Sequence, residues 1–402
     1  MINLEPPAKL DALTYQANMA ATHVLRPISR KYDSAEHSYP IELDTLAELV
    51  AQASAAQAGL HTGDTAEPAP AEAEGNVNGR SLASLIGLIE MCWGDVGLML
   101  TMPRQGLGQA AIRAVATPEQ LARFGGKWAA MAITEPGAGS DSAAIRTTAV
   151  LDGEEYVLNG EKIFVTSGDR AELIVVWATL DRSAGRGAIK SFVVERDNPG
   201  LKLDRLEHKL GIRASDTANF VLENCRVPKE NLLGSPEVTT AREGFAGVMQ
   251  TFDNTRPMIA GMAVGVARAA LERTRELLEQ AGVSIDYDRP LMAQSAAVAE
   301  FIRLEADWEA SRLLSLKAAW MADNRMPNTV AASIAKAKAG RVATDVTLRC
   351  VALCGTVGYG EDELLEKWAR DAKILDIFEG TQQIQQLVIA RQLLGKQSSE
   401  LR

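Results

Sequence analysis

The chain of 402 residues has only four cysteines and four histidines, and it has no long apolar run. The cysteines lack the paired spacing of a disulfide framework or of a structural zinc site, so we expect free thiols, no metal site and a reduced, cytoplasmic setting. No segment approaches the length of about eighteen apolar residues that a membrane span needs. The first ten residues contain no basic segment followed by an apolar one, so no signal peptide is expected.

Positive charge is in the minority, because 42 lysines and arginines face 52 acidic residues and leave a net charge of −10. The basic residues form no tract, which argues against a nucleic-acid-binding protein. No GxGxxG turn follows a strand pattern, and the Walker A, HExxH and GxSxG motifs are missing. A nucleotide cofactor would therefore need a binding device other than a Rossmann turn.

The hydrophobic pattern divides the chain into three regions and predicts an α+β fold. Residues 1–130 are predicted as an N-terminal helical domain, residues 131–237 as a middle antiparallel β-domain, and residues 238–402 as a C-terminal four-helix bundle. Within the first region, residues 61–80 offer little that could pack, and we interpret them as a mobile surface loop.

The individual elements follow from apolar periodicity and turn signals. Ser81–Leu100 is predicted as one helix, and the C-terminal helices are predicted over roughly residues 259–281, 291–323, 328–354 and 382–395. The predicted strands, separated by turns such as Asp152-Gly153, Asn159-Gly160 and Ser167-Gly168, are Tyr156–Leu158, Lys162–Thr166, Leu173–Ala178, Ser191–Val194 and Asn219–Leu222.

The segment TEPGAGSD, residues 134–141, joins the first two regions. Its Pro and Gly residues suit a tight structural loop at a domain junction, which is the commoner role of such a segment. The alternative is a binding loop, because small residues let backbone N–H groups approach a ligand, and Thr134 and Ser140 add hydroxyls.

A second segment runs from RDAKI, residues 370–374, to EGTQQIQ, residues 379–385. Thr381 is a suitable N-cap for the helix that follows it. Glu379 is then either a solvated glutamate at a helix entrance or a carboxylate presented between Phe378 and Gly380 into an apolar site. In the second case desolvation would raise its pKa toward the value that a general base needs.

The third segment is FDNTRP, residues 252–257, where Pro257 interrupts a helical pattern and predicts a kink. The pair Asp253 and Arg256, three residues apart, is open to a bland interpretation as a weak surface ion pair.

Together these segments resemble the acyl-CoA dehydrogenase family over the chain from about residue 81 to its end. TEPGAGSD, NGEKIFVTSG, LGIRASDT with VPKENLLG, FDNTRP, and RDAKI with EGTQQIQ stand in the order and spacing of that family. The resemblance implies a helical N-terminal domain, a middle β-domain and a C-terminal four-helix domain, with FAD as the cofactor.

The resemblance also implies a role for individual residues. Glu379 falls on the catalytic glutamate, which would take a proton from Cα of a CoA thioester while hydride leaves Cβ for the flavin. The implied cofactor-binding residues are Thr134 at the isoalloxazine, Phe164 and Thr166 lining the flavin, and Thr381 and Gln383 near its ribityl and phosphate side. The implied substrate-binding residues are Ser140, Asp253, Arg256 and Gly380. Electrons would pass to an electron-transferring flavoprotein.

Two departures from the family pattern concern the part of the flavin site that a neighbouring subunit provides. Val283 and Asp286 stand where homotetrameric members have the Arg and Phe of an Arg-x-x-Phe-Gly motif. Ala352, Gly355 and Thr356 stand where those members have a Gln and two Gly. We therefore expect an α2β2 heterotetramer with a related subunit that supplies this part.

Other functions remain open at this stage. The flavin of an acyl-CoA oxidase would be reoxidised by O₂, and a non-catalytic subunit would only complete the site of a partner. Intact Glu379 and TEPGAGSD argue against the latter. Lipid or steroid side-chain degradation is the expected setting, since bacterial heteromeric members of the family often act on bulky steroid side-chain thioesters.

Overall fold

The computed structural model describes residues 8–49, 79–104, 107–238, 246–396 and 400. The loop expected at residues 61–80 falls outside this part of the chain except for its last two residues. The first described elements are a 3₁₀ turn (Ala8–Leu10), helix α1 (Asp11–Ala20), a π-helical turn (Ala21–Leu25) and helix α2 (Arg26–Ser34). Residues 42–49 are also helical, and the further helices before the sheet are α4 (Arg80–Gly94), α5 (Val96–Thr101), α6 (Leu107–Val115) and α7 (Pro118–Phe124).

The predicted helix Ser81–Leu100 is two helices, α4 and α5, broken at Asp95. Asp95 has an extended backbone, and its carboxylate accepts a hydrogen bond from the backbone N–H of Leu98 at 2.8 Å. An aspartate in this geometry caps a new helix. The apolar periodicity continues across the break, which is why the pattern alone predicted one helix.

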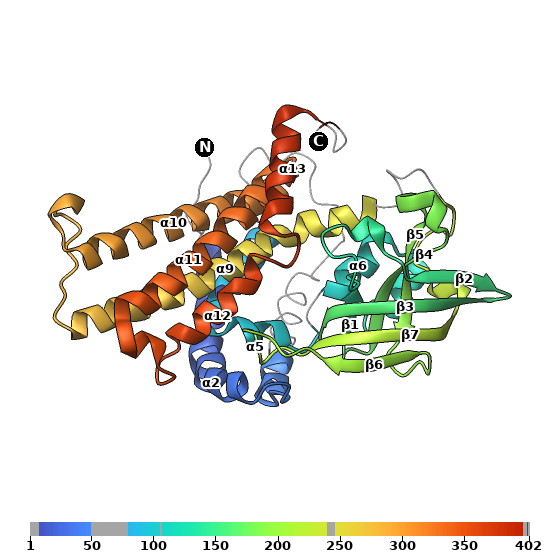
Figure 1. Cartoon of the computed structure of the whole chain (residues 1–402), viewed down its shortest axis with the longest axis horizontal. Coiled ribbons are helices and arrows are strands. Elements are labelled where there is room, and N and C mark those ends of the chain that lie inside the picture. The colour runs from blue at the N-terminus through green and yellow to red at the C-terminus, as the bar shows by residue number, and fades with distance from the viewer. Residues whose placement is uncertain (1–7, 50–78, 105–106, 239–245, 397–399, 401–402) are drawn as a thin grey trace.

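Seven strands form one sheet in the order β1-β4-β2-β3-β7-β6, with β5 paired to the other side of β4 (Figure 1). Most neighbours are antiparallel, but β1 and β2 run parallel to β4, which the sequence did not predict. The bounds of the strands are β1 Ala129–Ala132, β2 Thr148–Asp152, β3 Glu155–Thr166, β4 Leu173–Thr179, β5 Ile189–Glu195, β6 Leu201–Leu206 and β7 Thr217–Pro228.

The turn predicted at Asn159-Gly160 is wrong, because both residues lie inside the continuous strand β3. A side chain at Gly160 would overlap Thr147, so this glycine permits a close backbone approach instead of a turn, and the register with β7 shifts beside it. The turn predicted at Asp152-Gly153 is confirmed. It joins β2 to β3, with Gly153 at φ 64°.

Long helices return after the sheet and confirm the α+β class. They are α9 (Ala246–Gln280), α10 (Ala296–Asp323), α11 (Thr329–Tyr359), α12 (Leu365–Leu375) and α13 (Gln382–Leu394). Helix α4 packs into the same apolar core as α9, α10 and α11. Side chains at Gly261 or Gly265 of α9 would overlap α4, so these glycines allow the two helices to approach closely.

Candidate active site

Glu379 lies in the short turn between α12 and α13, and the backbone of this turn is unusual. Glu379 has φ 56° and Gly380 has φ 88°, so two successive residues are left-handed. A non-glycine residue in this region is strained and is held there by its surroundings. The buried side-chain amide of Gln385 donates hydrogen bonds of 3.2 Å to the backbone carbonyls of Glu379 and Gly380. Thr381 accepts from the N–H of Ile384 at 3.3 Å and caps α13, as predicted.

The carboxylate of Glu379 is only partly exposed and faces helix α9. The hydroxyl of Thr255 donates to Glu379 Oε2 at 2.9 Å. Burial raises the pKa of Glu379 above the ordinary value of 4.5, although the Thr255 hydrogen bond and the charges of Lys336 and Arg256 oppose the shift. The interpretation of Glu379 as an ordinary solvated glutamate is therefore not supported, and the group has the environment of a tuned base.

Lys336 of α11 provides a second polar anchor for the same turn. Its side chain is 1% exposed, and its ammonium donates to the carbonyl of Gly380 at 2.7 Å. Burial lowers the pKa of Lys336 to about 8, against the attraction of Asp376 and Glu379. A cation held here stabilises the anionic form of Glu379 without contacting its carboxylate directly.

The segment FDNTRP contributes to this site through α9. Arg256 is only 3% exposed, which argues against its interpretation as half of a surface ion pair. The side chain of Asp253 lies outside the described residues. Pro257 lies inside α9, which continues on both sides of it.

The loop TEPGAGSD is held by Glu135, which the sequence interpretation had not singled out. The carboxylate of Glu135 is buried and accepts from the ammonium of Lys162 at 2.7 Å and from the backbone N–H groups of Arg146 and Thr147 at 2.6 and 2.9 Å. Burial lowers the pKa of Lys162 to about 8, although Glu135 opposes the shift. This internal anchoring fixes the loop, in agreement with its structural interpretation, and it leaves Ser140 exposed.

Phe164 and Thr166 lie on β3, directly beside this loop, because the carbonyl of Thr134 accepts from Ile163 N–H at 2.9 Å. Phe164 is 58% exposed and left-handed, with φ 58°, where the register of β3 with β7 shifts. Bulges often turn side chains out of a sheet next to binding sites. An exposed aromatic ring, flanked by the partly buried Thr134 and Thr166, fits one face of a flat, conjugated ring system.

The predicted site residues thus form two groups. Arg256, Glu379 and Gly380 lie together in the helical part, where Gln383 is exposed at the start of α13. Thr134, Ser140, Phe164 and Thr166 lie in the sheet and its loop. Thr255, Lys336 and Gln385, which contact the Glu379 turn, were missed by the sequence interpretation. Lys336 carried a usable signal, because it falls on the buried alanine-rich face of α11.

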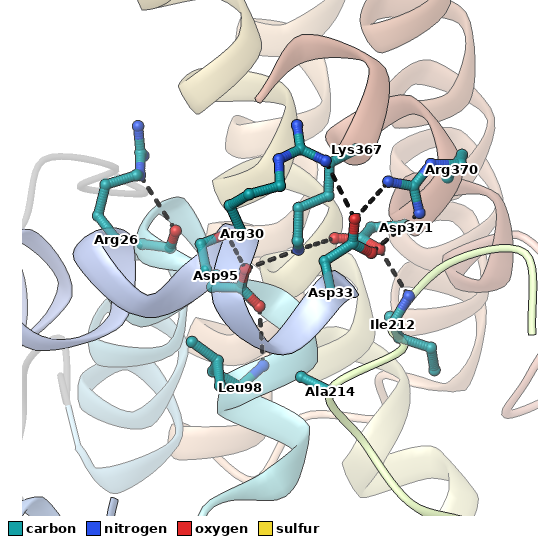
Figure 2. A network of polar contacts seen from close by, with 12 residues as sticks. Arg26, Arg30, Asp33, Asp95, Leu98, Ile212, Ala214, Lys367, Arg370 and Asp371 are labelled. Carbon is teal, nitrogen blue, oxygen red and sulfur yellow. Dashed lines mark hydrogen bonds and ion pairs between the residues drawn. The ribbon is translucent and has the colours of Figure 1, made fainter. Parts of the chain in front are cut away.

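The RDAKI segment has a structural role that the sequence did not reveal (Figure 2). The ammonium of Lys367 is buried between Asp95, at 2.6 Å, and Asp371, at 2.5 Å. Asp371 also accepts from the N–H of Ile212 at 2.6 Å, and Arg370 pairs with Asp33 of α2 at 2.6 Å. This network joins α12 to α2, to the start of α5 and to the connection between β6 and β7, and so it fixes the helix that precedes Glu379.

Most of the residues at which the sequence departs from the family pattern are exposed on the surface. Val283 is partly buried against the helical core, whereas Asp286 is exposed and accepts from the N–H of Asp288 at 3.0 Å. Ala352, Gly355 and Thr356 are exposed on α11, where Gly355 has a left-handed backbone. None of these side chains offers a cation to a pyrophosphate.

Comparisons with known proteins identify the family. Family models for the acyl-CoA dehydrogenase middle domain and C-terminal domain match residues 130–225 and 242–394. The short-chain specific acyl-CoA dehydrogenase of Clostridium acetobutylicum is 37% identical over 327 residues, which are 79% of this chain and 83% of that protein. The mitochondrial short-chain specific acyl-CoA dehydrogenase of Mus musculus is 40% identical over 270 residues, 67% of this chain and 64% of the relative, so the match spans just under two thirds of the mouse protein.

The same fold is also found among solved structures. The structure of butyryl-CoA dehydrogenase from Megasphaera elsdenii aligns with a TM-score of 0.82 at 29% identity, and the alignment covers 98% of this chain and 100% of that one. In the part of the chain that the structure describes, no helix is both long and apolar enough to cross a membrane. The chain belongs to the acyl-CoA dehydrogenase family, whose members are flavoproteins.

Proposed function

We propose that this chain catalyses the FAD-dependent α,β-dehydrogenation of an acyl-CoA thioester, with Glu379 as the general base. The observation that carries the proposal is the Glu379 turn, which holds a carboxylate of raised pKa against the hydroxyl of Thr255 on two successive left-handed residues. A base with a pKa raised toward the working pH accepts protons efficiently. When bound, FAD would supply the acceptor for the hydride from Cβ of the substrate.

The chain's own residues position and deprotonate the substrate. Thr255 occupies Glu379 Oε2 and leaves Oε1 to take the proton from Cα. The backbone N–H of Glu379 is assigned to the thioester oxygen, on which negative charge develops as the proton leaves. Ser140, Asp253, Arg256 and Gly380 are assigned to the acyl-CoA.

The residues of the sheet fit the ring end of the cofactor. The exposed ring of Phe164 offers a stacking face, and the hydroxyls of Thr134 and Thr166 offer hydrogen bonds at its edge. Thr381 and Gln383 are assigned to the ribityl and phosphate side. Fixed alignment of Cα with the base and of Cβ with the hydride acceptor is what the protein adds to the chemistry of the cofactor.

The exposed surface around Val283 and Asp286 supports the proposal of an α2β2 heterotetramer with a related subunit that lacks its own base. One FAD would then bind to each pair of unlike subunits, its ring on this chain and its pyrophosphate on the partner. The proposed electron acceptor is an electron-transferring flavoprotein, and the proposed setting is cytoplasmic lipid or steroid side-chain degradation.

The test is to purify the chain alone and co-expressed with a related subunit encoded beside it. FAD content is measured first, and then anaerobic bleaching of the flavin by acyl-CoA thioesters of increasing length and bulk. Bleaching by at least one thioester is expected for the complex, and bleaching by none would contradict the proposed activity. A yellow homo-oligomer with one FAD per chain and full activity would contradict the heterotetramer alone.

A further inference from the structure

A cluster of metal-binding side chains lies apart from the Glu379 turn, where the end of α2 meets the connection after β6. Glu36 and His37 follow α2, and His208 follows β6. One carboxylate oxygen or imidazole nitrogen of each residue lies within 4.8 Å of the corresponding atoms of the other two. The rings of His37 and His208 meet edge to face with centroids 4.9 Å apart. No second cluster of this kind occurs among the described residues.

His37 is the member whose surroundings call for a ligand. Its backbone is left-handed, with φ 67°. Both ring nitrogens are enclosed, and within the described part of the chain neither has a hydrogen-bond partner. An imidazole always carries at least one donor, and in the neutral form also a lone pair, so two enclosed nitrogens without partners need an explanation such as a bound ion or water.

Glu36 is already oriented for coordination. Its Oε1 accepts from the backbone N–H of Lys209 at 3.0 Å, and its Oε2 lies 2.7 Å from His208 Nδ1. The ammonium of Lys209 donates to the carbonyls of Ser215 at 2.8 Å and Glu207 at 3.4 Å. Outer hydrogen bonds of this type hold metal-ligating carboxylates in place.

We propose that Glu36, His37 and His208 bind a divalent transition-metal ion, best suited to Zn²⁺, as a structural clip between the end of α2 and the β6–β7 connection. Two imidazoles and one carboxylate form a donor set that zinc prefers, whereas Mg²⁺ and Ca²⁺ prefer oxygen atoms alone. Zinc–nitrogen distances of about 2.0–2.1 Å place tetrahedral ligands roughly 3.3 Å apart. The three side chains therefore need only small rotations to close on one ion, and water would complete the coordination.

The metal ion would add to contacts that an ion pair and a hydrogen bond already make between these two parts of the chain and α12. Arg370 reaches Asp33 near the end of α2, and Asp371 reaches Ile212 in the same β6–β7 connection. A metal ion that binds the folded chain and not the unfolded chain stabilises the fold by mass action. The effect is therefore expected in melting temperature, independently of flavin and of substrate.

The test uses the full chain, treated with a chelator and then titrated calorimetrically with Zn²⁺, with Mg²⁺ as the comparison ion. We expect a site of one Zn²⁺ per chain, a higher melting temperature with Zn²⁺, and no response to Mg²⁺. His37→Asn, which tolerates the left-handed backbone, and His208→Gln should each weaken Zn²⁺ binding by at least about tenfold. His23→Gln, at an exposed histidine outside the cluster, is the matched control and should bind as the wild type does.

A second measurement does not depend on the folding of any variant. Co²⁺ added to the wild-type chain should give the visible absorption of a four-coordinate site with nitrogen and oxygen ligands, and Zn²⁺ should displace it. The proposal is overturned if the wild type binds neither ion. It is equally overturned if folded His37→Asn and His208→Gln bind Zn²⁺ as tightly as the wild type.

Discussion

The turn around Glu379 and the surface around Val283 and Asp286 differ sharply, although the resemblance assigns both to flavin sites. Glu379 is held by Thr255, Gln385 and the left-handed turn itself. At the other surface Asp286 is exposed, and Val283 stands where the family motif has an arginine. A site under functional constraint keeps its strained backbone and its buried polar partners. The contrast supports one working catalytic part and one part left to a partner.

The largest effect is expected from Glu379→Gln, which keeps the volume of the side chain and removes the base. Turnover of the flavin-loaded complex should fall by about 10²–10⁴ while FAD content stays unchanged. Glu361→Gln, at an exposed glutamate in the connection between α11 and α12, is the control and should leave turnover unchanged. If Glu379→Gln kept wild-type turnover, Glu379 would not be the base, and the contrast between the two regions would not hold.

A large loss of stability is expected from Lys367→Met. The variant leaves Asp95 and Asp371 buried without their shared cation, and breaking a buried pair in this way costs about 3–5 kcal/mol. Lys202→Met is the matched control, because Lys202 pairs with Glu223 on the surface, where ion pairs contribute little. Chemical denaturation of both variants measures the difference, and equal free energies of unfolding would contradict the role of the network.

A smaller effect, on FAD affinity, is expected when the surface around Val283 and Asp286 is changed toward the family pattern. Replacing Val283 by Arg and Asp286 by Phe in the chain purified alone restores the Arg and the Phe of the family motif, while Tyr287 stays at the position of its Gly. A charge-assisted bond to phosphate contributes about 1.5–3 kcal/mol, so FAD should bind about 10- to 100-fold more tightly. Val283→Gln is the control without the charge. Fluorescence titration with FAD measures the affinities, and equal values for the double variant and the control would argue against a lost half-site.

The fold class could be predicted, and Glu379 could be singled out as the candidate base, because both depend on local order along the chain. Apolar periodicity predicts the long helices, and the segment EGTQQIQ carries Glu379 itself. Thr255 and Lys336 could not be predicted as partners of the Glu379 turn, since they stand on other helices and reach it only after packing. The clustering of Glu36 with His208 escaped the search for metal ligands for the same reason.

Other errors arose where one local signal has two physical meanings. Gly160 is a turn residue by composition, yet in the sheet it makes room for Thr147. Asp95 looks like a solvated residue of a long helix, yet it caps α5 and pairs with Lys367. Strand β6 was missed because its exposed face is polar. The limits of the three predicted domains and the assignment of the remaining site residues stay predictions.

The pH dependence of flavin reduction tests the central claim most directly. Glu379 acts in its deprotonated form, so the rate of anaerobic bleaching by acyl-CoA should rise with pH through a pKa above the ordinary value of 4.5. Thr255→Val removes a hydrogen bond that lowers this pKa, so the rise should move to higher pH, while Thr329→Val, at a threonine outside the site, should leave it in place. A rate independent of pH, or a profile that Thr255→Val leaves unchanged, would contradict Glu379 as the tuned base.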